Sequence, residues 1–180
     1  MNRFLVALSA TASLLLLAPG TAHAVDPAPC VKPESESKSR SSVDEGEIRY
    51  TDSSQYDPEI KHAIAAWQYS GAKIKIVGDT TSTVNDLDFQ DFNDSKSTAA
   101  GIWSYNAAPA WTDYIRFNKA KMSSYSAKKR RSVAAHELGH ALGPCHKDFE
   151  TTNSLMWPQV QEDFDVPQAV DKANYKKLWG

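Results

Sequence analysis

This 180-residue sequence has only two cysteines, a single long apolar run and no marked excess of positive or negative charge. Lysine and arginine (20 residues) nearly balance aspartate and glutamate (22 residues). Because nucleic-acid-binding proteins usually carry a marked basic excess, we expect no nucleic-acid partner. Beyond the N-terminus no apolar run is long enough to cross a bilayer, so we expect no membrane association of the mature protein. The length suits a single folded domain, and we expect a monomer.

The one long apolar run begins the chain. Arg3 provides a positive charge before it, and the apolar segment 4–19 is too short and too interrupted by Ser and Thr to span a membrane well. The sequence Ala22-His23-Ala24 then offers an Ala-x-Ala cleavage site. This pattern predicts a secretory signal peptide over residues 1–24, and therefore a secreted, extracellular protein. The alternative is an N-terminal helix that anchors the protein.

Proline, serine, glutamate and lysine dominate residues 25–46. Almost nothing in this stretch could enter a hydrophobic core. We interpret it as a flexible tail or a short pro-segment, with the folded domain over residues 47–180.

Apolar periodicity within the domain predicts a mixture of strands and helices. Alternating residues indicate strands at 47–50, 73–77, 99–105 and 114–118, with a weaker candidate at 87–92. Helical spacing indicates helices from Asp57, with this aspartate as N-cap, to Gly71, from about Ser126 to Gly143, and from Pro167 to Leu178. This order of elements predicts an α+β fold with a short sheet and a few helices.

Three of the five histidines lie in one short segment, His136-Glu137-Leu138-Gly139-His140-Ala141-Leu142-Gly143-Pro144-Cys145-His146. Two histidines four residues apart project from the same face of a helix, where their nitrogens can share one zinc ion. Gly143 lets the chain turn back, so that His146 can reach the metal as third ligand and a fourth position stays open for water. Glu137 points beside the metal, where it can act as general base and acid toward a zinc-activated water.

This segment carries the full motif H-E-x-x-H-x-x-G-x-x-H, and on that basis the chain resembles the metzincin metalloproteases, in particular their matrixin branch. A second match is Ser154-Leu155-Met156-Trp157-Pro158, which is close to the matrixin methionine turn A-L-M-Y-P. A third is the helix over residues 168–180, which resembles the end of a matrixin catalytic domain. The small secreted snapalysins are similar in size, but their third ligand is an aspartate where this chain has His146.

The resemblance covers about residues 47–180 and implies a metzincin-like catalytic domain. Such a domain has a short twisted mixed sheet with an antiparallel edge strand, an active-site helix, a methionine turn and a C-terminal helix. The resemblance implies that Met156 shapes the floor beneath the zinc without binding it. It also implies that an extended substrate pairs with the edge strand, which by its position in the chain is Gly101-Ile102-Trp103-Ser104-Tyr105.

One catalytic zinc ion is the cofactor that these residues support. Animal matrixins hold a second, structural zinc with three further histidines, but in the mature chain only His62 lies outside the motif. The acidic residues Asp86, Asp88, Asp91 and Asp94 could bind calcium, although a solvated loop is the favoured interpretation.

The two cysteines, Cys30 and Cys145, allow two interpretations. In an oxidising compartment a disulfide is the default for two cysteines, and here it would tie residues 25–46 beside the zinc motif. The alternative is a cysteine switch, in which a Cys30 thiolate occupies the fourth zinc position, because the sequence around Cys30 faintly resembles the matrixin prodomain motif P-R-C-G-V-P-D. We favour the disulfide, because the switch would leave Cys145 unpaired.

Together these features predict a secreted zinc-dependent endopeptidase that acts on protein or peptide substrates. His136, His140 and His146 would hold the metal and Glu137 would be the catalytic residue. One alternative is a narrow-specificity processing enzyme or a hydrolase of cell-wall peptide. Another is an extracellular protein that holds zinc without turnover, but such a protein would be free to lose Glu137, and this chain has it.

Overall fold

The computed structural model describes residues 25–108 and 112–180, so the predicted signal peptide, residues 1–24, lies outside the described part. The elements follow in the order β1 (Glu47–Asp52), α1 (Asp57–Trp67), β2 (Lys75–Gly78), β3 (Leu87–Phe92), β4 (Gly101–Ser104), β5 (Asp113–Asn118), α2 (Lys119–Met122), α3 (Ala127–Ala141) and α4 (Ala169–Trp179). Among the described residues, no helix combines the length and the apolar character needed to cross a bilayer. The short helix α2 is the one element that the sequence did not predict.

The five strands form one mixed sheet in the order β2-β1-β3-β5-β4. Strands β2, β1, β3 and β5 are parallel to one another. Strand β4 runs antiparallel to β5, with Trp103 opposite Ile115. The antiparallel edge strand therefore lies where it was expected, although Tyr105 falls just beyond its last residue. The architecture is mixed α/β and mostly parallel, which is consistent with the predicted α+β class.

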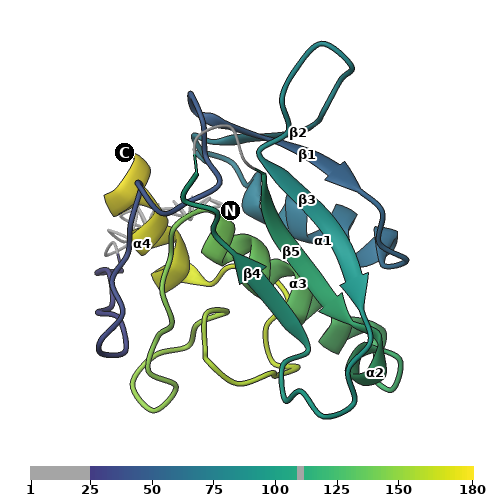
Figure 1. The fold of residues 1–180 in the computed structure, drawn as a ribbon. Helices are drawn as coiled ribbons and strands as arrows, with labels where there is room; N and C mark the ends of the chain where they lie inside the picture. Colours follow the sequence, from purple (N-terminus) through teal and green to yellow (C-terminus); the bar gives the residue numbers. More distant parts are fainter. Residues whose placement is uncertain (1–24, 109–111) are drawn as a thin grey trace, which may run out of the picture.

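Alternation along the inner strands builds the core. Leu87, Phe89, Ile115 and Phe117 are all fully buried. Figure 1 shows α1 and α3 lying together against one face of the sheet, with α3 next to β4 and β5. The site-bearing helix is thus anchored on the sheet beside its free edge.

The two long helices begin at different kinds of N-terminus. In α3, Ser126 caps the helix, because its side chain accepts a hydrogen bond from the N–H of Lys129. The expectation that Asp57 caps α1 is wrong: the N-cap is Tyr56. The N–H groups of Glu59 and Ile60, which an Asp57 cap would bind, donate instead to the carbonyl of Tyr56.

Residues 25–46 run beside α4 (Figure 1) and are bound to the domain rather than free, which differs from the predicted flexible tail. The N–H groups of Ser37 and Ser42 donate to the carbonyls of Gly143 and Ala141, at the C-terminus of α3. Helix C-termini leave carbonyls without intrahelical partners. This segment satisfies one of them, that of Ala141, and also the carbonyl of Gly143 just beyond the helix. The low apolar content of residues 25–46 suggested a flexible tail, but the contacts that attach this segment to the domain are polar hydrogen bonds.

Candidate metal centre

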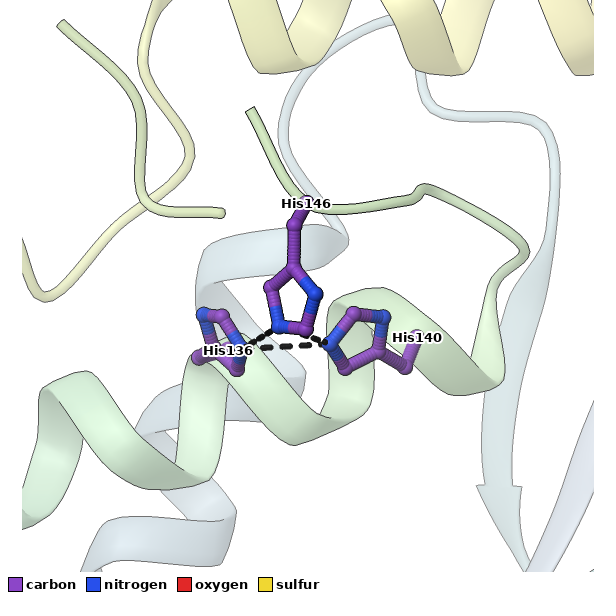
Figure 2. A group of neighbouring side chains, drawn as sticks. All are labelled: His136, His140 and His146. Carbon is purple, nitrogen blue, oxygen red and sulfur yellow. Dashed lines mark hydrogen bonds between the residues drawn. The ribbon is translucent and has the colours of Figure 1, made fainter. Parts of the chain in front are cut away.

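The helix α3 and the loop after it bring the three motif histidines together. Leu138 and Ala141 of α3 are fully buried, and His136 and His140 project from another side of the helix. The chain leaves the helix at Gly143, whose φ of +97° is readily adopted by glycine alone. His146 then lies above the other two rings, and all three point toward one centre (Figure 2).

The Nε2 atoms of the three imidazoles face one another. Nε2 of His140 lies 3.1 Å from Nε2 of both His136 and His146, and the remaining pair is 3.3 Å apart. Three nitrogens bound to one tetrahedral zinc at ~2.0–2.1 Å would lie ~3.3 Å from each other. The observed triangle therefore fits a single zinc ion.

The partners of the opposite ring nitrogens fix the tautomers. Nδ1 of His136 contacts the carbonyl of Leu155 at 3.0 Å, and Nδ1 of His140 contacts the carbonyl of Pro144 at 3.0 Å. Nδ1 of His146 contacts Oε1 of Glu34 at 2.8 Å. A carbonyl or carboxylate oxygen only accepts, so each Nδ1 carries the hydrogen and each Nε2 presents a lone pair. Three converging lone pairs repel one another unless a cation lies between them.

The two helical histidines are uncharged at neutral pH, as metal ligands must be. Burial, together with the neighbouring imidazole of His140, holds the pKa of His136 well below its usual value. Burial and the neighbouring His146 lower the pKa of His140 to about 4. Both side chains are therefore ready to ligate without first losing a proton.

Glu137 lies between α3 and the edge strand. Its Oε2 accepts a hydrogen bond of 2.8 Å from the backbone N–H of Trp103 in β4. Burial raises the pKa of Glu137 to about 7, although the Trp103 N–H favours the ionised form; a cation at the centre would also favour that form. A Cβ at Gly101 would lie 2.7 Å from Cγ of Glu137, so a glycine is needed there.

Met156 is fully buried in the turn that passes beneath the helix. Its Sδ packs so closely on Gly139, between the two helical histidines, that a side chain at Gly139 would overlap it. The turn is held from α4, because the carboxylate of Asp171 accepts hydrogen bonds from the Ser154 hydroxyl and the Leu155 N–H. The sequence did not single out Asp171, since an aspartate in the first turn of a helix is common.

Two cavities flank the histidines. The larger, of about 570 Å³, is bounded by β4, α3 and the segment after Met156. The other, of about 370 Å³, is bounded by residues 33–40 and the end of α3. Trp103, His140 and His146 line both. An extended ligand that filled both cavities would therefore cross the histidine centre.

The two cysteines lie beside this centre. Cys30 and Cys145 form a disulfide with their Cα atoms 5.6 Å apart, so the structure has the disulfide and not the cysteine switch. The bond places Glu34 against His146, the residue after Cys145. Partial burial alone would raise the pKa of Glu34, but its hydrogen bonds with His146 outweigh this and lower it.

The acidic residues considered for calcium bind neighbouring groups of the chain. Asp86 accepts from the N–H of Arg49, Asp88 from the Thr51 hydroxyl, and Asp91 from the Ser54 hydroxyl. In residues 25–108 and 112–180, the groups of three close ligand atoms are the histidine triad and a group of Cys30, Glu36 and Cys145. The second group contains the two sulfurs of the disulfide, which leaves the histidine triad as the candidate metal centre.

In comparisons with known proteins, no family model matches the sequence and no curated protein is significantly similar to it. Function is therefore inferred from the centre's own geometry.

Proposed function

We propose that this protein is a secreted zinc-dependent endopeptidase of metzincin, matrixin-like type. The observation that carries the proposal is the convergence of three Nε2 lone pairs next to a buried carboxylate, at the free edge of the sheet. Three protein ligands with an open fourth position are typical of catalytic zinc sites, whereas structural sites are closed by four.

Each part of the centre has a role in peptide-bond hydrolysis. The three imidazoles would hold a zinc ion, which would supply Lewis-acid polarisation of a peptide carbonyl and a lowered pKa of a water molecule. Glu137 would accept a proton from the attacking water and deliver it to the leaving amine. The Trp103 N–H holds Oε2 of Glu137, so that Oε1, which has no hydrogen bond among the described residues, is the oxygen that exchanges the proton.

The edge strand supports substrate binding through the main chain. The Ala100 carbonyl accepts from Asn118 of β5, whereas the Trp103 N–H points away from β5 toward Glu137. Because backbone groups alternate along a strand, those of Gly101 also face outward. A substrate strand can pair there with little side-chain selectivity and continue into both flanking cavities.

The disulfide and the predicted signal peptide support an extracellular location. Disulfides persist in oxidising compartments and are rare in cytosolic proteins. Protein or peptide chains in that compartment would be the substrates, and the acid–base residue and the zinc would act without any other cofactor.

The experiment that tests the proposal is digestion of a peptide library, read by mass spectrometry, with and without a chelator. We expect internal cleavage that the chelator abolishes and added Zn²⁺ restores. Cleavage of a few related sequences only would favour the narrow-specificity alternative. Stoichiometric zinc binding without cleavage of any peptide, including cell-wall peptide, would overturn the proposal in favour of a zinc-holding protein.

A further inference from the structure

The third histidine is placed differently from the other two. His136 and His140 are fixed by helix α3, whereas His146 lies in an irregular segment. A ligand in a loop has no helical hydrogen bonds to hold its backbone. Some other part of the chain must therefore keep its ring pointing at the centre.

Residues 30–34 make these contacts. Oε2 of Glu34 accepts the backbone N–H of His146 at 2.9 Å, and the N–H of Val31 donates to the His146 carbonyl at 3.0 Å. Oε1 of Glu34 accepts the hydrogen of Nδ1 at 2.8 Å. The Cys30–Cys145 disulfide closes the assembly one residue before His146. Both backbone groups and the ring of His146 are thus bound by a single short segment.

The group that accepts the Nδ1 hydrogen of His146 also differs chemically from the partners of the other two histidines. His136 and His140 donate to backbone carbonyls, but His146 donates to a carboxylate. A carboxylate behind a ligating imidazole fixes its tautomer and raises its basicity, and loss of such a partner typically weakens metal affinity roughly 10- to 100-fold.

We propose that residues 30–34 clamp His146 in its ligating orientation, and that Glu34 is a positioning residue that sets the zinc affinity. The inference rests on the zinc site of the proposed function. It makes the segment a working part of that site, so that its removal would weaken zinc binding and would not activate a latent enzyme.

The test is the zinc affinity of the full protein and of Glu34→Gln, measured by competition with a chromophoric chelator. Glutamine keeps the size of the side chain and removes its charge. We expect zinc affinity roughly 10- to 100-fold weaker. The metal-free protein should also melt at a lower temperature, because the amide nitrogen of glutamine cannot accept one of the two hydrogen bonds from His146. The control is Glu45→Gln, an exposed residue away from the histidines, for which we expect the wild-type affinity. Equal affinities of the wild type and Glu34→Gln would overturn the proposal.

A second readout separates this inference from the zinc site itself. In the metal-free protein, nitrogen NMR should show His146 as the Nδ1–H tautomer, and Glu34→Ala should give a mixture of tautomers. Unchanged tautomers in Glu34→Ala would overturn the clamp. A wild type that binds no zinc would overturn the proposed function, while the tautomers would still decide whether Glu34 positions His146.

Discussion

Three hydrogen bonds made on the far side of the rings define the candidate site residue by residue. Leu155, Pro144 and Glu34 each accept the hydrogen of one Nδ1. The motif spacing predicts that the three histidines meet, but of these acceptors only the Pro144 carbonyl lies within the motif. Leu155 comes from the turn around Met156, and Glu34 from a segment more than 100 residues earlier.

The Glu34 contact could have been anticipated in part. The disulfide favoured from the sequence already places Cys30 beside Cys145, and Glu34 follows four residues later. What the sequence does not reveal is that the chain turns so that this carboxylate, rather than that of Glu36, reaches His146. That choice depends on the conformation of residues 31–36.

A pH-dependent prediction concerns Asp52, far from the histidines. Partial burial, with the carboxylates of Asp57 and Asp91 nearby, raises the pKa of Asp52 from its ordinary 3.8 to about 6. A carboxyl whose pKa is higher in the folded protein stabilises the fold while it is protonated, and this contribution is lost as pH rises through the folded value. Asp52→Asn should therefore raise the melting temperature at pH 7.5.

The same substitution should have little effect near pH 3.5, below both pKa values, because Asp52 is then mostly protonated in the folded and unfolded chains. The control is Asp26→Asn, an exposed aspartate outside this acidic group, which should leave the melting temperature unchanged at both pH values. A stabilisation by Asp52→Asn that was as large at pH 3.5 as at pH 7.5 would contradict the charge-based explanation.

At the scale of elements, the edge strand β4 and helix α3 meet at a glycine. A Cβ at Gly101 would lie 2.7 Å from Cγ of Glu137 and 2.8 Å from Cγ1 of Val133. We predict that Gly101→Ala displaces the Glu137 side chain and lowers turnover about 100-fold, the effect expected when a reacting group moves by ~1 Å. Zinc content should not change, because the atoms nearest to the added Cβ belong to Glu137 and Val133 and not to a histidine.

The matched control for Gly101→Ala is Gly78→Ala at the end of strand β2, where an added Cβ meets nothing within 4 Å. Steady-state kinetics on a cleaved peptide and metal analysis of all three proteins give the comparison. Wild-type turnover in Gly101→Ala would show that contact between β4 and Glu137 does not position the carboxylate.

Most elements could be predicted because their apolar periodicity is strong. β1, β2 and β5 lie within a few residues of the predicted ranges. The missed parts depend on contacts distant in sequence. The helix α2 has only four residues and is capped by the buried Asn118, whose side chain also binds the carbonyls of Asp94 and Ala99. Such a short turn carries no periodic signal.

In the molecule as a whole, residues 25–46 join parts of the domain that are distant in sequence. Lys147 is fully buried, and its ammonium group donates to Oε1 of Glu36 at 2.6 Å and to the carbonyl of Ala28 at 3.0 Å. Asn174 of α4 donates to the same Glu36 oxygen. The backbone N–H of Lys147 donates to the Met156 carbonyl, so this ion pair connects the segment with α4 and the methionine turn.

Removing one member of this pair should be costly. Glu36→Ala leaves the buried ammonium of Lys147 without its counter-charge, and we predict a loss of about 3–5 kcal/mol in the free energy of unfolding. Denaturant titration of the metal-free protein measures it. The double variant Glu36→Ala with Lys147→Met should recover much of the loss, because no charge then remains buried. A loss below ~1 kcal/mol in the single variant would mean that the segment contributes little to the fold.

The most direct test of the central claim is the turnover of Glu137→Ala, compared with the wild type at equal zinc content. The three imidazoles remain in this variant, so it should bind one zinc ion per chain as the wild type does. Without the general base and acid, the rate of cleavage of the same peptide should fall by about 10²–10⁴-fold. A Glu137→Ala protein that carried one zinc ion and cleaved the peptide at the wild-type rate would contradict the account.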